Sequence, residues 1–464
     1  MSRDTEDTPL LASTGLDHEV VYKRFAPREK RSIVALVSFS ALLPLFVTGS
    51  FIPSIPDIAK DFDSTAEVIS LAVSLSVLAN AFGSLVWAAY SAFYGRRVVY
   101  ILSLTCQCIG SLGVASSRTI PQLLALRIVQ AFGTSSGLSI GIAVIGDIYK
   151  LEERGAASGV FFGCVLLGPA LAPVVGGIAA QYWSWRVMQL LLLAAGAIIL
   201  TLVVLFLPET AHPGTRGIEK AQERGVKARW VWLNPFKSLT LLRSPNVTIV
   251  AVASGLAMLT EYALLVPIAY TMGARYGINN AAIVGMLFIP NGLGNLVGAP
   301  LSGKLSDKIL VKMRAERGGV WVPEDRLRVT LIGASVMAPL AVLLSGIFIT
   351  YVDGTLGIVL NLFCLFTTGV GLTFILIPSS AYAVDILHSR SAEVSAATMA
   401  LRGLIIATST SGVMPMINQL GVFRTYTITA VIGWIAFGLL WTVIRYGDRL
   451  RASVDMGYSN THNN

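Results

Sequence analysis

The sequence predicts an all-α membrane protein with twelve transmembrane helices arranged as two six-helix bundles. Three observations support this fold class: a low charge density, a series of long apolar segments, and an uneven distribution of basic residues. Of the 464 residues, 54% are hydrophobic and only 13% are charged, and the mean hydropathy is +0.69. A soluble domain typically carries about 25% charged residues, so this chain is too apolar for a soluble globule. Long disordered and nucleic-acid-binding classes are excluded for the same reason.

The apolar segments fall into two groups of six, and each is close to the roughly 20 residues that a membrane span needs. The first group lies at 32–54, 68–91, 98–116, 121–146, 155–180 and 186–207. The second group lies at 246–272, 281–303, 328–350, 355–383, 392–418 and 423–445. The expected organisation is therefore an N-terminal tail, an N-terminal bundle, a central loop, a C-terminal bundle and a C-terminal tail, at 1–31, 32–207, 208–245, 246–445 and 446–464. Residues 1–31 show no cleavable signal pattern.

The basic residues predict the orientation of the chain. Of the 35 Lys and Arg residues, 28 lie in the tails and the loops on the side of both termini, and five lie in the opposite loops. Because cytosolic loops carry an excess of Lys and Arg, both termini are expected in the cytosol. The net charge of +9 is thus mainly a consequence of topology, and the remaining two basic residues, Arg127 and Arg402, lie within spans.

Neither a metal, a cofactor nor an enzymatic site is expected. Four cysteines lie inside apolar segments with no disulfide or zinc spacing. Four histidines lie in loops, in tails or at a helix end, and no nucleophile–base arrangement accompanies them. No Gly-x-x-x-x-Gly-Lys-Ser/Thr motif is present, which argues against direct coupling to ATP.

Several short motifs follow one another along the chain. The loop after the second span ends in Tyr94-Gly95-Arg96-Arg97, and the fourth span contains Arg127-Ile128-Val129-Gln130-Ala131-Phe132-Gly133. A Gly- and Pro-rich segment occupies 163–177, and Leu207-Pro208-Glu209-Thr210 follows the sixth span. The combination resembles the major facilitator superfamily, and more specifically its fungal twelve-span drug/proton antiporter branch, from about residue 40 to 445. The resemblance implies the major facilitator fold and secondary active transport.

One position departs from the family pattern. The acidic residue that the family places before Tyr-Gly-Arg-Arg is Ala92 here. In the family this carboxylate helps to close the cytosolic side, so its absence should weaken one gate contact, and Asp307 in the matching loop of the second half is expected to replace it. Asp147 and Asp385 end the fourth and tenth spans, each with a basic residue downstream, and either gating or plain surface pairing explains them. The gating candidates are Gly95, Arg96, Arg97, Asp147, Arg154, Asp307, Asp385 and Arg390.

Ionisable side chains inside a span cost at least about 2.5 kcal/mol each, so they are functional candidates by default. Glu261 is expected about 21 Å into the seventh span, at a depth that matches Arg127 in the fourth span. Arg402 is expected close to the middle of the eleventh span. Glu261 is the candidate proton-coupling group, because burial penalises an ionised carboxyl group. Arg127 or Arg402 could compete with that proton or receive an anionic substrate, while permanent pairing as scaffold is the alternative.

Two further sets of residues complete the predicted site. For Arg127 the resemblance implies proton coupling, and for the glycines and prolines of the fifth span it implies a hinge and a leak barrier that favour exchange. These hinge candidates are Gly163, Gly168, Pro169, Pro173, Gly176 and Gly177. Polar side chains inside spans need partners and could line a substrate cavity. The substrate-binding candidates are Arg402, Gln130, Asn80, Tyr262, Tyr270, Asn291, Asn295 and Asn361.

The expected function is export of a small organic molecule driven by inward proton movement, through alternating access. Two buried arginines make a secreted organic acid at least as plausible as a drug, a polyamine or another metabolite. A proton-coupled importer and a non-transporting receptor are the alternatives. The expected partners are the substrate, protons and the bilayer, for a monomer in the cell membrane or else in a vacuolar or endosomal membrane.

Overall fold

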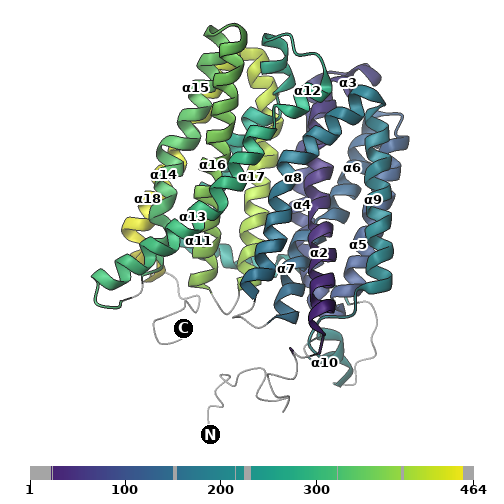
Figure 1. Ribbon diagram of the computed structural model, residues 1–464. Helices are drawn as coiled ribbons and strands as arrows, with labels where there is room; N and C mark the ends of the chain where they lie inside the picture. Colours follow the sequence, from purple (N-terminus) through teal and green to yellow (C-terminus); the bar gives the residue numbers. More distant parts are fainter. Residues whose placement is uncertain are drawn as a thin grey trace.

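The computed structural model describes residues 22, 24–149, 154–214, 216–223, 231–320, 322–387 and 391–452. These residues form helices and loops, without a strand among them. Twelve helical spans within them are long and apolar enough to cross a membrane, which confirms the expected number (Figure 1). The cytosolic location of the termini stays a prediction.

Six spans make up the first half of the chain. Its elements are α2 (Pro27–Gly49), η1 (Ile52–Ser54), α3 (Ile55–Asp61), α4 (Ala66–Tyr94), α5 (Arg96–Ser116), α6 (Ile120–Thr134), α7 (Ser136–Ile148), α8 (Arg154–Tyr182) and α9 (Trp185–Phe206). The first span is interrupted after Gly49, and η1 and α3 follow with Pro53 and Pro56 at their second positions. Proline is tolerated at these starts because its missing N–H has no helical partner there.

The second half repeats this plan with more interruptions. Its elements are α11 (Pro245–Leu265), η3 (Ala269–Gly273), α12 (Ala281–Met286), α13 (Ile289–Glu316), η4 (Pro323–Val329), α14 (Thr330–Ile332), η5 (Gly333–Met337), α15 (Ala338–Tyr351), α16 (Gly354–Ile386), α17 (Ser391–Leu420) and α18 (Val422–Ala452). Two elements of the central loop are also helical, α10 (Gly217–Glu223) and η2 (Pro235–Arg243).

The two halves meet most closely at one end of the molecule. We call the face where α2 begins and α18 ends the terminal face, and the other end, which carries α3 and the start of α12, the opposite face (Figure 1). A buried apolar cluster joins the halves near the opposite face and includes Phe51 and Ile55 together with Leu287 and Phe288. The other two large clusters each belong to one half. The halves are therefore sealed by apolar packing near the opposite face.

Three helix pairs form most of the boundary between the halves. The helices α4 and α17 pack together along their length, and α8 packs against α12 and α13. The contact of α8 is very close at Gly292, where an added Cβ would lie 2.3 Å from the Cβ of Ala170. Nearer the terminal face, an added Cβ on Gly163 of α8 or on Gly303 of α13 would meet no atom within 4 Å. Neither glycine is therefore part of a close helix–helix contact.

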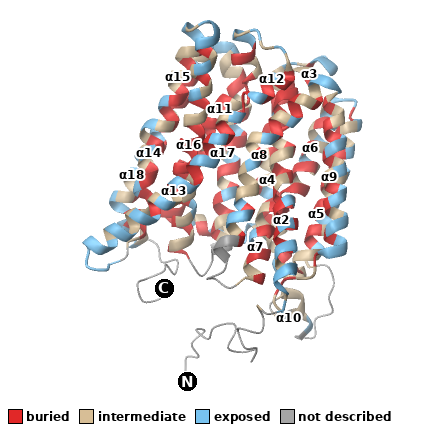
Figure 2. Cartoon of the chain, in the orientation of Figure 1, coloured by how far each residue is buried: buried red, intermediate tan, exposed pale blue. Residues whose placement is uncertain are grey.

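Burial follows this arrangement. Buried residues lie along the surfaces where helices face each other, and exposed residues lie at the two ends of the molecule and along the outer sides of the peripheral helices (Figure 2). Large apolar side chains such as Phe39 on α2, Ile198 on α9 and Phe363 on α16 are exposed. In a membrane protein such side chains contact lipid, so their exposure carries no penalty.

Candidate functional site

Glu261 lies in the last turns of α11 and is almost completely buried, with 6% of its surface exposed. Its carboxylate oxygen Oε1 accepts a hydrogen bond from the amide nitrogen of Asn295 on α13, at 3.3 Å. The same amide nitrogen lies 3.3 Å from Oδ1 of Asn291, one turn earlier on α13. The structure therefore joins three of the predicted residues in one cluster. No ion pair to Glu261 occurs within the described part of the chain.

Arg127 on α6 is completely buried but lies in the interior of the first half. One terminal nitrogen donates to the carbonyl oxygen of Val47 at 3.0 Å and to the side-chain oxygen of Gln130 at 2.9 Å. The guanidinium carbon lies 4.2 Å from the centroid of the Phe51 ring, a cation–π contact. The other two guanidinium nitrogens make no hydrogen bond within the described residues. Arg127 is thus held by neutral groups only.

Gln130 extends this polar cluster inside the first bundle. Its amide nitrogen donates to the hydroxyl of Ser111 at 2.8 Å and to the side-chain oxygen of Gln189 at 2.9 Å. These partners come from α5 and α9, so the whole cluster belongs to one half. In this conformation Gln130 and Arg127 do not reach Glu261 of the second half, although Arg127 and Glu261 were expected at matching depth.

Arg402 on α17 is 7% exposed and belongs to the second half. Its guanidinium donates to the hydroxyl of Ser380 at 3.2 Å and to the hydroxyl of Ser254 at 3.3 Å. Its Nε atom makes no hydrogen bond among the described residues. Two weak neutral contacts leave much of its hydrogen-bonding capacity free, because a guanidinium group has five N–H donors. The neighbouring Gly403 lies against Ala81 of α4, so Arg402 is next to the boundary between the halves.

The remaining substrate candidates separate into different environments. Asn80 on α4 is half-buried beside Ala81 at that same boundary. Tyr262 is half-buried and packs on the apolar cluster that joins the halves. Tyr270 lines a surface pocket at the opposite face. Asn361 bonds to Ser345 and the backbone of its own helix, inside the second half.

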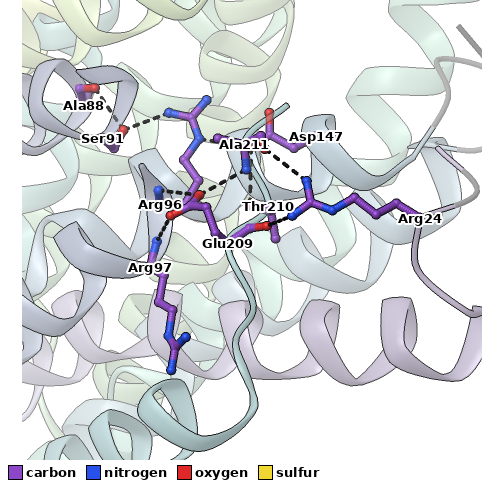
Figure 3. A network of polar contacts seen from close by, with 9 residues as sticks. All are labelled: Arg24, Ala88, Ser91, Arg96, Arg97, Asp147, Glu209, Thr210 and Ala211. Carbon is purple, nitrogen blue, oxygen red and sulfur yellow. Dashed lines mark hydrogen bonds and ion pairs between the residues drawn. The ribbon is translucent and has the colours of Figure 1, made fainter. Parts of the chain in front are cut away.

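The predicted gate of the first half is a network of polar contacts around Glu209, at the end of α9 (Figure 3). Its two carboxylate oxygens accept the backbone N–H groups of Arg96, at 2.9 Å, and Arg97, at 3.3 Å, which open α5. Gly95 has φ of +105°, and an added Cβ would lie 2.3 Å from the Glu209 carboxylate. Arg24 donates to the carbonyl oxygens of Glu209 and Ala211. Glu209 therefore supplies an acidic group at the start of α5, close to the loop in which Ala92 replaces the acidic residue of the family.

Arg96 completes the network through its side chain. The Nε atom lies 3.0 Å from a carboxylate oxygen of Asp147, and Nη1 donates to the hydroxyl of Ser91 at 2.9 Å (Figure 3). Among the described residues, Arg96 thus forms an ion pair with Asp147, and the Thr210 hydroxyl donates to the same carboxylate oxygen at 3.4 Å. The side chain of Arg154, the expected partner, lies outside the described residues, although α8 begins at this position.

The second half contains a matching arrangement. Arg326 in η4 lies 2.8 Å from a carboxylate oxygen of Asp385 and 2.9 Å from one of Asp307. Arg326 opens the ninth span as Arg96 opens the third, and Asp385 ends the tenth span as Asp147 ends the fourth. Asp307 therefore pairs with the same arginine as Asp385, within the second half. Arg390, the expected partner of Asp385, lies outside the described residues.

The predicted hinge residues of α8 differ in their surroundings. An added Cβ on Gly176 would lie 2.2 Å from the carbonyl oxygen of Ser50, and one on Gly177 would lie 2.3 Å from that of Ala281. Gly168 lies against the Leu45 side chain, whereas Gly163 faces open space. The helix continues through Pro169 and Pro173 without interruption. Three glycines therefore permit close packing in this conformation, and the hinge role of the segment stays a prediction.

Two contacts that the sequence did not single out join the halves at the opposite face. The amide nitrogen of Asn418 on α17 donates to a carboxylate oxygen of Glu67 on α4, at 2.5 Å. The backbone N–H of Ala281, at the start of α12, donates to the side-chain oxygen of Gln181 on α8, at 3.0 Å. No local motif marks these residues, because their partners are more than 99 positions away.

Together, twelve membrane-length helices in two halves, each with buried ionisable side chains, are typical of a polytopic membrane transport protein. The model of the Major Facilitator Superfamily matches residues 37–410, and the chain belongs to this family of transporters. It is similar to MFS antiporter QDR3 of Candida albicans, with 23% identity over 97% of this chain and 84% of the relative. It is also similar to Citrate exporter 1 of Aspergillus niger, with 26% identity over 91% of this chain and 87% of the relative. These relatives confirm the resemblance to fungal antiporters and exporters.

The fold also agrees with solved structures. The D-xylose-proton symporter superposes with a TM-score of 0.65 at 15% identity, over 88% of this chain and 97% of that chain. At this identity the similarity concerns the fold alone.

Proposed function

We propose that this transporter exports a small organic molecule in exchange for protons, with Glu261 as the proton-coupling group. The observation that carries the proposal is the burial of this carboxyl group beside two amides, with no cation paired to it among the described residues. The rival interpretation of Glu261 as half of a permanent scaffold ion pair has no support in this conformation.

The amide partners suit a group that gains and loses a proton. An isolated buried carboxylate is costly, so a buried group of this kind is neutralised by a cation or by a proton. The nitrogen of an amide donates to a carboxylate, and its oxygen accepts from a protonated carboxyl group. Asn295 and Asn291 can therefore solvate both forms after a small rotation, and proton exchange would not dismantle the cluster.

The direction of transport rests on the relatives and on the α8 motif. The relatives carry the names antiporter and exporter, and the Gly- and Pro-rich segment resembles the antiporter motif of the family. We place export at the cell membrane, where it would remove the molecule from the cell, with a vacuolar or endosomal membrane as the alternative. A monomer suffices, because both halves come from one chain.

Arg402 is the proposed contact for a substrate carboxylate, and its position links substrate charge to the mode of coupling. Its partner Ser254 precedes Glu261 by seven residues on α11, which is about 10 Å along the helix. At this separation and an effective dielectric constant of about 20, two unit charges interact by about 1.7 kcal/mol. An anionic substrate at Arg402 would therefore strengthen proton binding at Glu261, which favours transport of the anion and the proton in the same direction. A cationic substrate near Glu261 would instead compete with the proton.

Because a bound anion strengthens proton binding, proton-coupled symport is the second candidate function. This candidate applies specifically to an organic acid as substrate. A drug, a polyamine or another cationic metabolite agrees better with proton antiport. The two candidates share one fold and one coupling residue, so they differ in the measured direction of proton movement.

Proteoliposomes with an imposed pH gradient test these proposals. The purified full chain is assayed with labelled organic acids, amines and drugs, and proton movement is followed with a pH-sensitive dye. We expect at least one compound to move against the direction of the protons, and Glu261→Gln to abolish this movement while substrate–substrate exchange persists. The control Asp353→Asn changes an exposed carboxylate and should leave both activities intact. Absence of flux for every compound would support the receptor alternative.

A further inference from the structure

The central loop forms a strap across the terminal face. We use the word strap for residues 231–243, which include η2. At its start, the backbone N–H of Val231 donates to the hydroxyl of Tyr94 on α4, at 2.9 Å. Farther along, Leu239 packs on an apolar cluster that includes Ala400 of α17. The strap therefore contacts both halves of the transporter.

An apolar groove lies between the strap and the outer surface of the first half. Its volume is about 450 Å³, and none of the described residues that line it is charged. The walls include Trp87 on α4, Val98 and Leu102 on α5, and Trp232 and Leu233 of the strap. The indole N–H of Trp87 donates to a backbone carbonyl oxygen of α6 at 2.7 Å, so this polar atom is already satisfied. The groove thus suits a hydrocarbon chain.

The length of α5 places this groove at the edge of the bilayer. Its 21 residues span about 31 Å, which matches a hydrocarbon core of about 30 Å. Val98 and Leu102 are each 47% exposed and lie in the first two turns, so they border the lipid region just inside the terminal-face boundary. Trp232 is 83% exposed at the mouth of the groove. Tryptophan is enriched at this level of a membrane, where its ring contacts both lipid and water.

Charge selects the class of lipid. The central loop, residues 208–245, contains seven Lys and Arg residues against three Glu residues. One of the basic residues, Lys237, follows the groove residue Pro235 by two positions. Clusters of basic residues next to a membrane span attract anionic headgroups. The apolar groove and the exposed Lys237, two positions after Pro235, therefore suit the two ends of one anionic lipid.

We propose that this groove binds one acyl chain of an anionic phospholipid from the leaflet at the terminal face, with its headgroup near Lys237. The bound chain fills the space between the strap and α4 and α5, and it fixes the strap against the first half. Because the strap also contacts α17, lipid occupancy reaches the boundary between the halves. This site is separate from Glu261 and from the proposed transport chemistry.

Tryptophan quenching by brominated lipid tests the site. The full chain in detergent micelles is titrated with dibromostearoyl phosphatidylglycerol or with dibromostearoyl phosphatidylcholine, and the signal of Trp232 is obtained as the difference from Trp232→Phe. We expect saturable quenching, with half-saturation at about fivefold lower concentration for the anionic lipid. Val98→Phe fills the groove and should abolish the saturable component. Ile109→Phe, at another exposed position of α5 outside the groove, should retain it.

Two results would overturn the proposal or its lipid selectivity, and a third would reassign the groove. Quenching that rises in proportion to the brominated lipid without saturation, and that is unchanged in Val98→Phe, would show ordinary boundary lipid and overturn the proposal. Equal half-saturation for both lipids would overturn its anionic selectivity. Competitive displacement by a transported compound would assign the groove to the substrate route instead. Leu102→Phe provides a second groove-filling variant if Val98→Phe does not fold.

Discussion

The contact between Glu67 and Asn418 allows the closure of the opposite face to be measured. These side chains join α4 to α17 at 2.5 Å, and the bond must break when the halves separate at this face. We expect Glu67→Ala to shift the conformational equilibrium toward a state that is open at the opposite face. The apolar cluster that includes Phe51 and Leu287 stays intact in this variant, so the fold itself should persist.

The size of the shift follows from the surroundings of the bond. Glu67 is half-buried and Asn418 is exposed, so water competes for the contact. A typical hydrogen bond contributes about 1 kcal/mol net to stability. At 25 °C this corresponds to about a fivefold change in the population ratio of the two states. A second bond, from Ala281 to Gln181, remains and limits the shift.

Double electron–electron resonance spectroscopy, with spin labels at the opposite-face ends of α4 and α17, reports this equilibrium. We expect a larger population at long distance in Glu67→Ala. The matched control is Asp353→Ala, because Asp353 is an exposed carboxylate on the same face that pairs with Arg275 inside the second half. An unchanged distance distribution in Glu67→Ala, or an equal change in the control, would refute the role of this contact.

Three further predictions concern packing and the terminal face. Gly177→Val should lower the melting temperature in detergent because its side chain would press on α12 within 2.3 Å, whereas Gly163→Val should be tolerated; equal losses would contradict the close-packing interpretation. Glu209→Ala should lower the free energy of unfolding by about 1–2 kcal/mol, measured by chemical denaturation, because the backbone N–H groups at the start of α5 lose their acceptor. If Glu209→Ala lowers this free energy no more than Glu209→Gln does, the role assigned to the carboxylate is contradicted. Asp385→Asn should weaken an ion pair within one half, so the spin-label distances between the halves should not change, and a clear shift would show that this pair gates.

The hydropathy pattern predicts the spans well because each helix must satisfy its own backbone in lipid, wherever its neighbours lie. The same reasoning does not predict which side of a helix faces which neighbour. Arg127 and Glu261 were expected at matching depth, yet Arg127 points to Val47 and Gln130 inside the first half. Depth follows from counting residues along the chain, whereas the direction of a side chain depends on how the helices pack.

The polar network around Glu209 shows a similar division between what is local and what depends on the fold. The motif ending in Arg96 and Arg97 marks the loop, and Asp147 and Asp385 mark the ends of their spans. The contact of Glu209 with the start of α5 joins residues 113 positions apart, so it requires the end of α9 to lie beside that loop. No periodicity or short motif contains this information.

The most direct test of the proposed proton coupling is the effect of Glu261→Gln on proton-driven transport in proteoliposomes. If Glu261 carries the proton, the variant will exchange labelled substrate across the membrane at a rate close to wild type but will not accumulate it in response to a pH gradient. Accumulation at the wild-type level in Glu261→Gln would contradict the assignment of Glu261 as the coupling group.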